Sequence, residues 1–109
     1  MRDEFGRYIG MFVIVTFDIV QAPTRREMGR RIYRVAKVMK AFGHRVQKSV
    51  FECHLDNPQI ETLKMRIMME INIELGDNVR FYKVCNSCFE KIEVLGMEGV
   101  TEDQEVYIF

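Results

Sequence analysis

The stretch MFVIVTFD, residues 11–18, is a short run of β-branched and aromatic residues that ends at Asp18. Residues of these types favour the pleated backbone of a sheet, so the run predicts a β-strand. Alternate positions of a strand point to opposite faces, and here both sets are largely apolar. We therefore expect a central strand covered on both sides, by helices on one face and by a second copy of the chain on the other.

The rest of the chain alternates between loop, helix and strand patterns. Residues 18–29 predict a loop that leads into a helix over residues 30–42, and Asn57-Pro58 is a typical helix start. Further strands are predicted over residues 46–53, 79–85, 92–95 and 106–109. The first helix has a buried stripe at three- and four-residue spacing, formed by Ile32, Val35, Ala36, Met39 and Phe42. The second has a similar stripe, formed by Ile60, Leu63, Ile67, Ile71 and Leu75 and ended by Gly76.

This order predicts an α+β protein with helices on one face of a sheet. It leaves the strand order open, because a helix separates the second and third predicted strands. Residues 1–10 are polar and lack periodicity, and Met11 could equally start the chain. We therefore treat residues 1–10 as a leader that is disordered or an alternative start. Residues 11–109 have the size of one domain.

Composition limits the class of protein. The longest apolar run is far shorter than the roughly 20 residues of a membrane helix, so no membrane role is expected. Three cysteines are an odd number, which fits a reducing cytoplasm better than a disulfide scaffold. Residues 25–48 hold nine basic residues and one acid, a net charge of +8 in a chain whose total is zero. Such asymmetry indicates a surface that faces a polyanion, and a solvated helix face is the alternative.

Asp18 is the residue with the clearest chemical potential, because the end of a central strand fixes the direction of its side chain. A carboxylate can hold a hard cation such as Mg²⁺ through oxygen. One carboxylate is a poor magnesium site, whereas two copies of Asp18 facing each other across a dimer axis would supply two. The alternative is an Asp that caps a helix or a turn.

Basic side chains that can neutralise phosphates follow in the chain. The residues that we expect to bind nucleic acid are Arg30, Arg31, Arg34, Lys37, Arg45 and Lys48. A zinc site at Cys85-x-x-Cys88 is a weaker alternative, because its second pair would be the adjacent Cys53 and His54, whose side chains point to opposite faces of a strand.

Three of these segments together resemble the CRISPR-associated protein 2 family. They are residues 11–18, residues 43–52 with the sequence GHRVQKSVFE, and residues 79–85 with the sequence VRFYKVC. Val94-Leu-Gly96 also matches, and the resemblance extends over residues 11–109. It implies a ferredoxin-like (split βαβ) sheet with two helices on one face, and a homodimer through the other face. It also implies that a C-terminal strand at residues 105–109 can pack on the partner subunit.

The resemblance also implies a function. Members of this family act in CRISPR spacer acquisition, where they bridge two dimers of the integrase subunit and hold protospacer DNA. Many are described as Mg²⁺-dependent nucleases on RNA or DNA, and Asp18 would then be both the catalytic and the metal-binding residue. Two alternatives remain open: a purely structural adaptor without catalysis, and a toxin-like ribonuclease of the same fold.

Overall fold

The computed structural model describes residues 10–20 and 24–96. The expected terminal strand at residues 106–109, and all but the last residue of the expected leader, lie outside these ranges. The elements in chain order are β1 (Met11–Asp18), α1 (Arg25–Lys40), β2 (Gly43–Gln47), β3 (Val50–Leu55), α2 (Asn57–Met68), the 3-10 turn η1 (Ile73–Leu75), β4 (Asn78–Val84) and α3 (Asn86–Phe89). No helix in the described part of the chain is both long enough and apolar enough to cross a bilayer.

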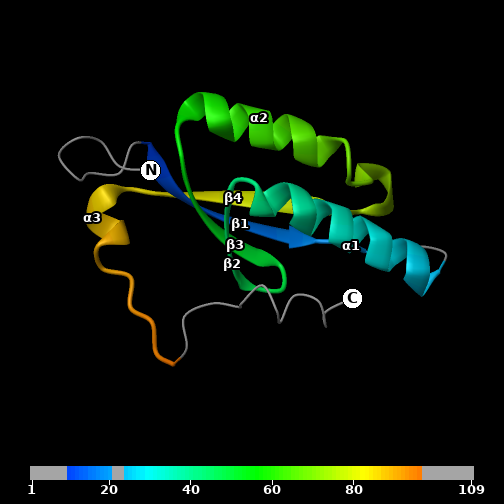
Figure 1. Ribbon diagram of the computed structural model, residues 1–109, viewed down its shortest axis with the longest axis horizontal. Coiled ribbons are helices and arrows are strands. Elements are labelled where there is room, and N and C mark those ends of the chain that lie inside the picture. Colours follow the sequence, from blue (N-terminus) through cyan, green and yellow to red (C-terminus); the bar gives the residue numbers. More distant parts are fainter. Residues whose placement is uncertain (1–9, 21–23, 97–109) are drawn as a thin grey trace.

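The four strands form one antiparallel sheet in the order β2-β3-β1-β4. Helices α1 and α2 lie together on one side of this sheet (Figure 1). The βαββαβ order with this arrangement is the ferredoxin-like fold, so the expected fold class is confirmed. The first strand is central, as its two apolar faces predicted.

One predicted strand is wrong, and its correction explains the topology. Residues 46–53 do not form a single strand, because the chain turns at residues 48–49 and makes the β2–β3 hairpin. Arg45 closes the turn by donating from Nε and Nη2 to the Lys48 carbonyl, at 3.0 and 2.6 Å. A break in register between Arg45 and Gln47 had blurred the alternation of side chains that would have marked two strands. This hairpin is the one that the ferredoxin-like pattern requires.

Helix boundaries also differ from the expectation. Helix α1 begins at Arg25 rather than at residue 30, because Thr24 caps it by accepting from the Glu27 amide at 3.1 Å. Its first turn is exposed and carries no apolar stripe, so hydrophobic spacing could not reveal it.

The second helix is shorter than its apolar stripe. Helix α2 is capped by Asp56 in a capping box with Gln59, and it ends at Met68. The chain then forms η1, whose end at Gly76 has a positive φ of 104° that favours glycine. Residues 92–95 do not form a strand, and the short helix α3 precedes them.

The core lies between the helices and one face of the sheet. On the two inner strands, the residues that face the helices are Val13, Val15, Phe17, Phe51, Cys53 and Leu55. Against them pack the predicted helix stripes, represented by Val35, Ala36, Met39, Ile60, Leu63 and Ile67. All of these side chains are buried, so the stripes are confirmed as core, apart from their ends.

The opposite side of the sheet, which we call the open face, carries the other set of β1 side chains. Phe12, Ile14 and Thr16 lie there, opposite alternate residues of β3 and β4. Of the described elements, α3 packs on this side through Phe89, whose ring centroid is 4.7 Å from that of Phe12. Tyr82, on β4, remains 48% exposed there. The open face is therefore only partly covered by the described part of one chain.

A buried ion pair joins the end of β1 to α1 and β4. The Asp77 carboxylate lies 3.2 Å from Arg31 Nε and accepts from Arg31 Nη2 at 3.3 Å. Asp77 also accepts from the backbone amides of Val20 at 2.9 Å and Asn72 at 2.8 Å. Arg31 Nη2 in turn donates to the Val20 carbonyl at 3.0 Å. We call this set, formed by Val20, Arg31, Asn72 and Asp77, the Asp77 clasp.

The clasp keeps Asp77 ionised. Burial by itself would raise the pKa of this carboxyl, but the hydrogen bonds from Asn72 and Val20, together with the hydrogen bond and charge of Arg31, lower it below its ordinary value. Because the group is held in its charged form, breaking the pair would leave a charge without its partner inside the protein.

We predict that Arg31→Met lowers the free energy of unfolding by about 3 kcal/mol, the usual cost of stranding a buried charge. The matched control is Arg34→Met, three residues further along α1 on its exposed surface. This substitution should leave the urea midpoint nearly unchanged. Urea unfolding followed by circular dichroism measures both. Equal losses for the two variants would contradict the structural role of Arg31.

Asp77 also predicts a pH dependence. An Asp in the unfolded chain has a pKa of about 3.9, and the pKa of Asp77 in the folded protein is lower. The stability that ionised Asp77 adds to the folded state is therefore complete above the unfolded pKa. It is lost as pH falls through the folded pKa. The difference in unfolding free energy between the wild type and Asp77→Asn should therefore be constant near neutral pH and shrink below about pH 4. Urea titrations across this range test it, and a difference independent of pH would be the contrary result.

Candidate metal and nucleic-acid sites

Asp18 is exposed at the last position of β1. It follows Phe12, Ile14 and Thr16 at alternate positions, so its side chain belongs to the open face. In the register of the sheet it lies opposite Asn78, the first residue of β4. Side chains of directly opposed residues lie on the same face, about 5 Å apart at Cβ. A carboxylate and a carboxamide oxygen are thus placed together at this end of the sheet.

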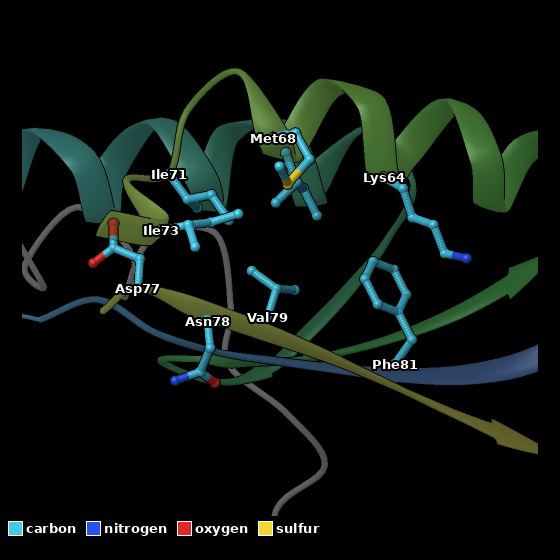
Figure 2. A pocket seen from close by; sticks show the side chains of 9 residues that line it. Lys64, Met68, Ile71, Ile73, Asp77, Asn78, Val79 and Phe81 are labelled. Carbon is cyan, nitrogen blue, oxygen red and sulfur yellow. The ribbon is translucent and has the colours of Figure 1, made fainter. Parts of the chain in front are cut away.

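The neighbouring residue, Asp77, serves the clasp instead. Figure 2 shows the Asp77 side chain on the side of η1, while the Asn78 side chain points away from the helices. Two adjacent residues therefore have different roles. Asp77 accepts a hydrogen bond from the amide of Val20, two residues after Asp18, and Asn78 lies opposite Asp18 itself. The clasp positions both strand ends that carry the candidate ligands.

The donor set fits Mg²⁺ in kind but is incomplete among the described residues. Mg²⁺ prefers oxygen ligands in octahedral geometry and keeps several waters. Within residues 10–20 and 24–96, no group of three or more His, Cys, Asp or Glu side chains is gathered as a metal cluster. Asp18 and Asn78 are thus two candidate oxygen ligands at this end of the sheet.

Three of the predicted nucleic-acid-binding residues lie along the exposed surface of α1. They are Arg30, Arg34 and Lys37, whose spacing of four and three residues places them on one side of the helix. Beside them is a polar hollow of about 440 Å³ between α1 and the end of α2, which Arg26, Arg30 and Arg34 line together with Glu27 and Glu70. This surface is therefore the candidate for contact with phosphates.

Two other predicted residues are inside the protein. Arg31 is 8% exposed and belongs to the Asp77 clasp. Arg45 is 2% exposed, closes the β2–β3 turn, and lies 5.5 Å over the ring of Phe51. Both guanidinium groups thus have structural partners in the chain. Lys48, at the tip of the same turn, is exposed.

Asp18 and the basic surface do not share one cleft. Asp18 belongs to the open face, whereas α1 covers the other face of the sheet. They are connected through the end of the sheet where β1 ends and α1 begins (Figure 1). The arrangement separates a potential metal centre from a potential phosphate-binding surface.

The structure does not assemble the weaker zinc alternative. Cys53 is buried in the core, whereas Cys85 and Cys88 are exposed at α3. An apolar hollow of about 410 Å³ lies between α2 and β4 and is lined by residues such as Ile67, Met68, Val79 and Phe81 (Figure 2). It offers little chemistry for catalysis.

Asp77 and Asn78 are the site residues that sequence reasoning missed. Their signal was the Gly76-Asp77-Asn78 turn directly before a strand, where short polar side chains commonly bond the backbone. The partner of Asp77 could not be read from the sequence, because Arg31 lies 46 residues away.

Comparison with known proteins identifies the family. Residues 11–92 match the family model described as CRISPR associated protein Cas2. The chain is 35% identical over 99 residues to the CRISPR-associated endoribonuclease Cas2 1 of Chloroflexus aurantiacus, covering 90% of this chain and 99% of that protein. It is 34% identical over 101 residues to the CRISPR-associated endonuclease Cas2 of Halalkalibacterium halodurans, covering 91% and 100%.

Solved structures agree with this assignment. The crystal structure of Streptococcus pyogenes Cas2 at pH 6.5 superposes with a TM-score of 0.67 at 34% identity, covering 79% of this chain and all of that one. A hypothetical protein from Thermus thermophilus gives a TM-score of 0.64 at 32% identity, covering 83% and 95%. Sequence and structure therefore converge, and the chain belongs to the CRISPR-associated protein Cas2 family.

Proposed function

We propose that this protein is a Mg²⁺-dependent endonuclease that binds nucleic acid as a homodimer in CRISPR spacer acquisition. Relatives with sequence identity of 34–35% over nearly their whole length are named endoribonuclease and endonuclease. The observation that carries the proposal is Asp18, an exposed carboxylate at the end of the central strand and opposite Asn78. The cytoplasm, where CRISPR loci lie, is the compartment that we assign to it.

The incompletely covered apolar residues of the open face support the dimer in this proposal. The open face presents Ile14 and the half-exposed Tyr82, which another apolar surface could cover. A two-fold axis near the ends of β1 would bring two copies of Asp18 together, and with them two copies of Asn78. One position in the sequence would then supply both carboxylates of the centre.

In the proposed reaction the chain binds, orients and holds charge. Asp18, assisted by Asn78, would hold Mg²⁺, which when bound supplies Lewis-acid stabilisation of the phosphate and a more acidic water. Arg30, Arg34 and Lys37 would bind the phosphate backbone by charge, independently of sequence. The clasp would keep the two strand ends in place while the substrate is bound.

The separation of Asp18 from the basic surface favours a second role. A duplex held on α1 would lie on the face opposite the metal centre, as expected of an adaptor that bridges an integrase subunit and protospacer DNA. In that structural reading Asp18 shapes the dimer interface and catalyses nothing. Binding by α1 is common to both readings, and cleavage distinguishes them.

We predict that Asp18→Asn lowers Mg²⁺-dependent cleavage by about 100-fold, because one ligand charge is lost from each protomer. The matched control is Asp56→Asn, which makes the same chemical change at the cap of α2, where Asn caps as well as Asp. Cleavage of labelled single-stranded RNA and duplex DNA is measured with Mg²⁺ and with EDTA. Unchanged cleavage by Asp18→Asn would remove Asp18 from the mechanism and leave the adaptor reading.

Binding is tested separately from cleavage through salt dependence. Each phosphate contact on duplex DNA contributes about −0.9 to the slope of log K against log salt concentration. We expect Arg30→Gln and Arg34→Gln each to reduce the magnitude of this slope by about 0.9. Lys64→Gln, which removes a lysine paired with Glu61 on α2, should leave it unchanged. Fluorescence anisotropy over a range of salt measures the slopes, and slopes equal to that of the wild type would count against α1 as the binding surface.

A further inference from the structure

A pair of cysteines outside the proposed metal and nucleic-acid sites forms a chemically distinct cluster. Cys85 is the N-cap of α3 and Cys88 lies three residues later on its first turn. Both thiols are exposed, in contrast to the buried thiol of Cys53. The Cys85 Sγ is 3.3 Å from the Ser87 hydroxyl oxygen, within hydrogen-bond distance.

The environment separates the two thiols chemically. Hydrogen bonding by the Ser87 hydroxyl, followed by the backbone amide and the thiol of Cys88, lowers the pKa of Cys85 to about 7. The hydrogen bond and charge of Cys85 raise the pKa of Cys88. At neutral pH Cys85 is therefore the more readily ionised thiol, and Cys88 is the one that keeps its proton more strongly. This is the division of roles found in Cys-X-X-Cys redox pairs.

The backbone permits closure of a bond between them. Cβ atoms three residues apart on a helix are about 5–6 Å apart, whereas a disulfide requires about 4 Å. Cys85 has an extended backbone, with φ −71° and ψ 161°, and stands half outside the helix. Closure therefore requires a movement of about 1–2 Å at this exposed end. The first-turn bond from the Phe89 amide to the Cys85 carbonyl, at 2.8 Å, already holds the two residues on one turn.

We propose that Cys85 and Cys88 form a redox-active dithiol that exchanges with low-molecular-weight disulfides and closes an intramolecular disulfide at the start of α3. The Cys85 thiolate attacks one sulfur of the small disulfide, forms a mixed disulfide and releases one thiolate. Cys88 loses its proton to solvent and attacks the Cys85 sulfur, which releases the second thiolate. Two electrons pass from the cysteines to the small disulfide, which leaves as two thiols.

The position of the pair gives the oxidation a structural consequence. Phe89, the residue after Cys88, packs on Phe12 at 4.7 Å and on His54 at 5.1 Å between ring centroids. The disulfide therefore braces the turn that seats Phe89 on the open face. Oxidation would therefore restrict the position of Phe89 at one edge of the open face, and reduction would release it.

The experiment uses the full chain in buffers of defined glutathione disulfide to glutathione ratio, followed by alkylation and intact-mass analysis. We expect the wild type to lose two hydrogens without dimerising covalently. Cys88→Ser should stop at the glutathione adduct on Cys85, and Cys85→Ser should react at least about tenfold more slowly. Cys53 is the internal control, because burial raises its pKa to about 11 and should keep it unreacted in the folded protein.

A second variant tests the proton assignment. Ser87→Ala removes the largest stabilisation of the Cys85 thiolate, so alkylation of Cys85 at pH 7 should slow by about threefold or more while the protein stays folded. The proposal is overturned if the wild type forms only intermolecular disulfides. Equal oxidation rates for Cys85→Ser and the wild type would overturn it as well.

Discussion

The Asp77 clasp is the interaction on which the placement of the candidate metal centre depends. It is a buried charge pair whose carboxylate also takes two backbone amides, so it ties the chain leaving β1 to α1 and to the start of β4. Buried ion pairs add little net stability, yet they are costly to break. Such a contact specifies geometry more than it stabilises the fold. Here the geometry that it specifies is the meeting of two strand ends, Asp18 and Asn78.

The sequence was informative where burial imposes periodicity. The apolar run at residues 11–17 identified the central strand, and the stripe of Val35, Ala36 and Met39 identified the buried side of α1. It failed where local polar chemistry decides the backbone. The turn at residues 48–49 depends on Arg45 reaching a carbonyl, and the early start of α1 depends on a threonine cap.

The candidate site shows the same division. Asp18 could be singled out because a strand end gives a carboxylate a fixed direction, and the charge of residues 25–48 indicated the basic surface. Which of its cations face solvent could not be read from spacing alone. Arg30 and Arg31 are adjacent in sequence, yet the side chain of Arg30 is exposed and that of Arg31 is buried in the clasp. Long-range pairing with a single aspartate decides the difference, and no local pattern encodes it.

The position of β1 in the sheet has a kinetic consequence. Its neighbours are β3 and β4, neither of which adjoins it in sequence, whereas β2 and β3 form a local hairpin. Pairing between distant segments must overcome the entropy of closing a long loop, so local elements form first. Asp18 and Asn78 are separated by most of the domain along the chain. We therefore expect their juxtaposition to arise late in folding, so that a chain emerging from the ribosome acquires its candidate metal-binding end only after the helices and the hairpin are in place.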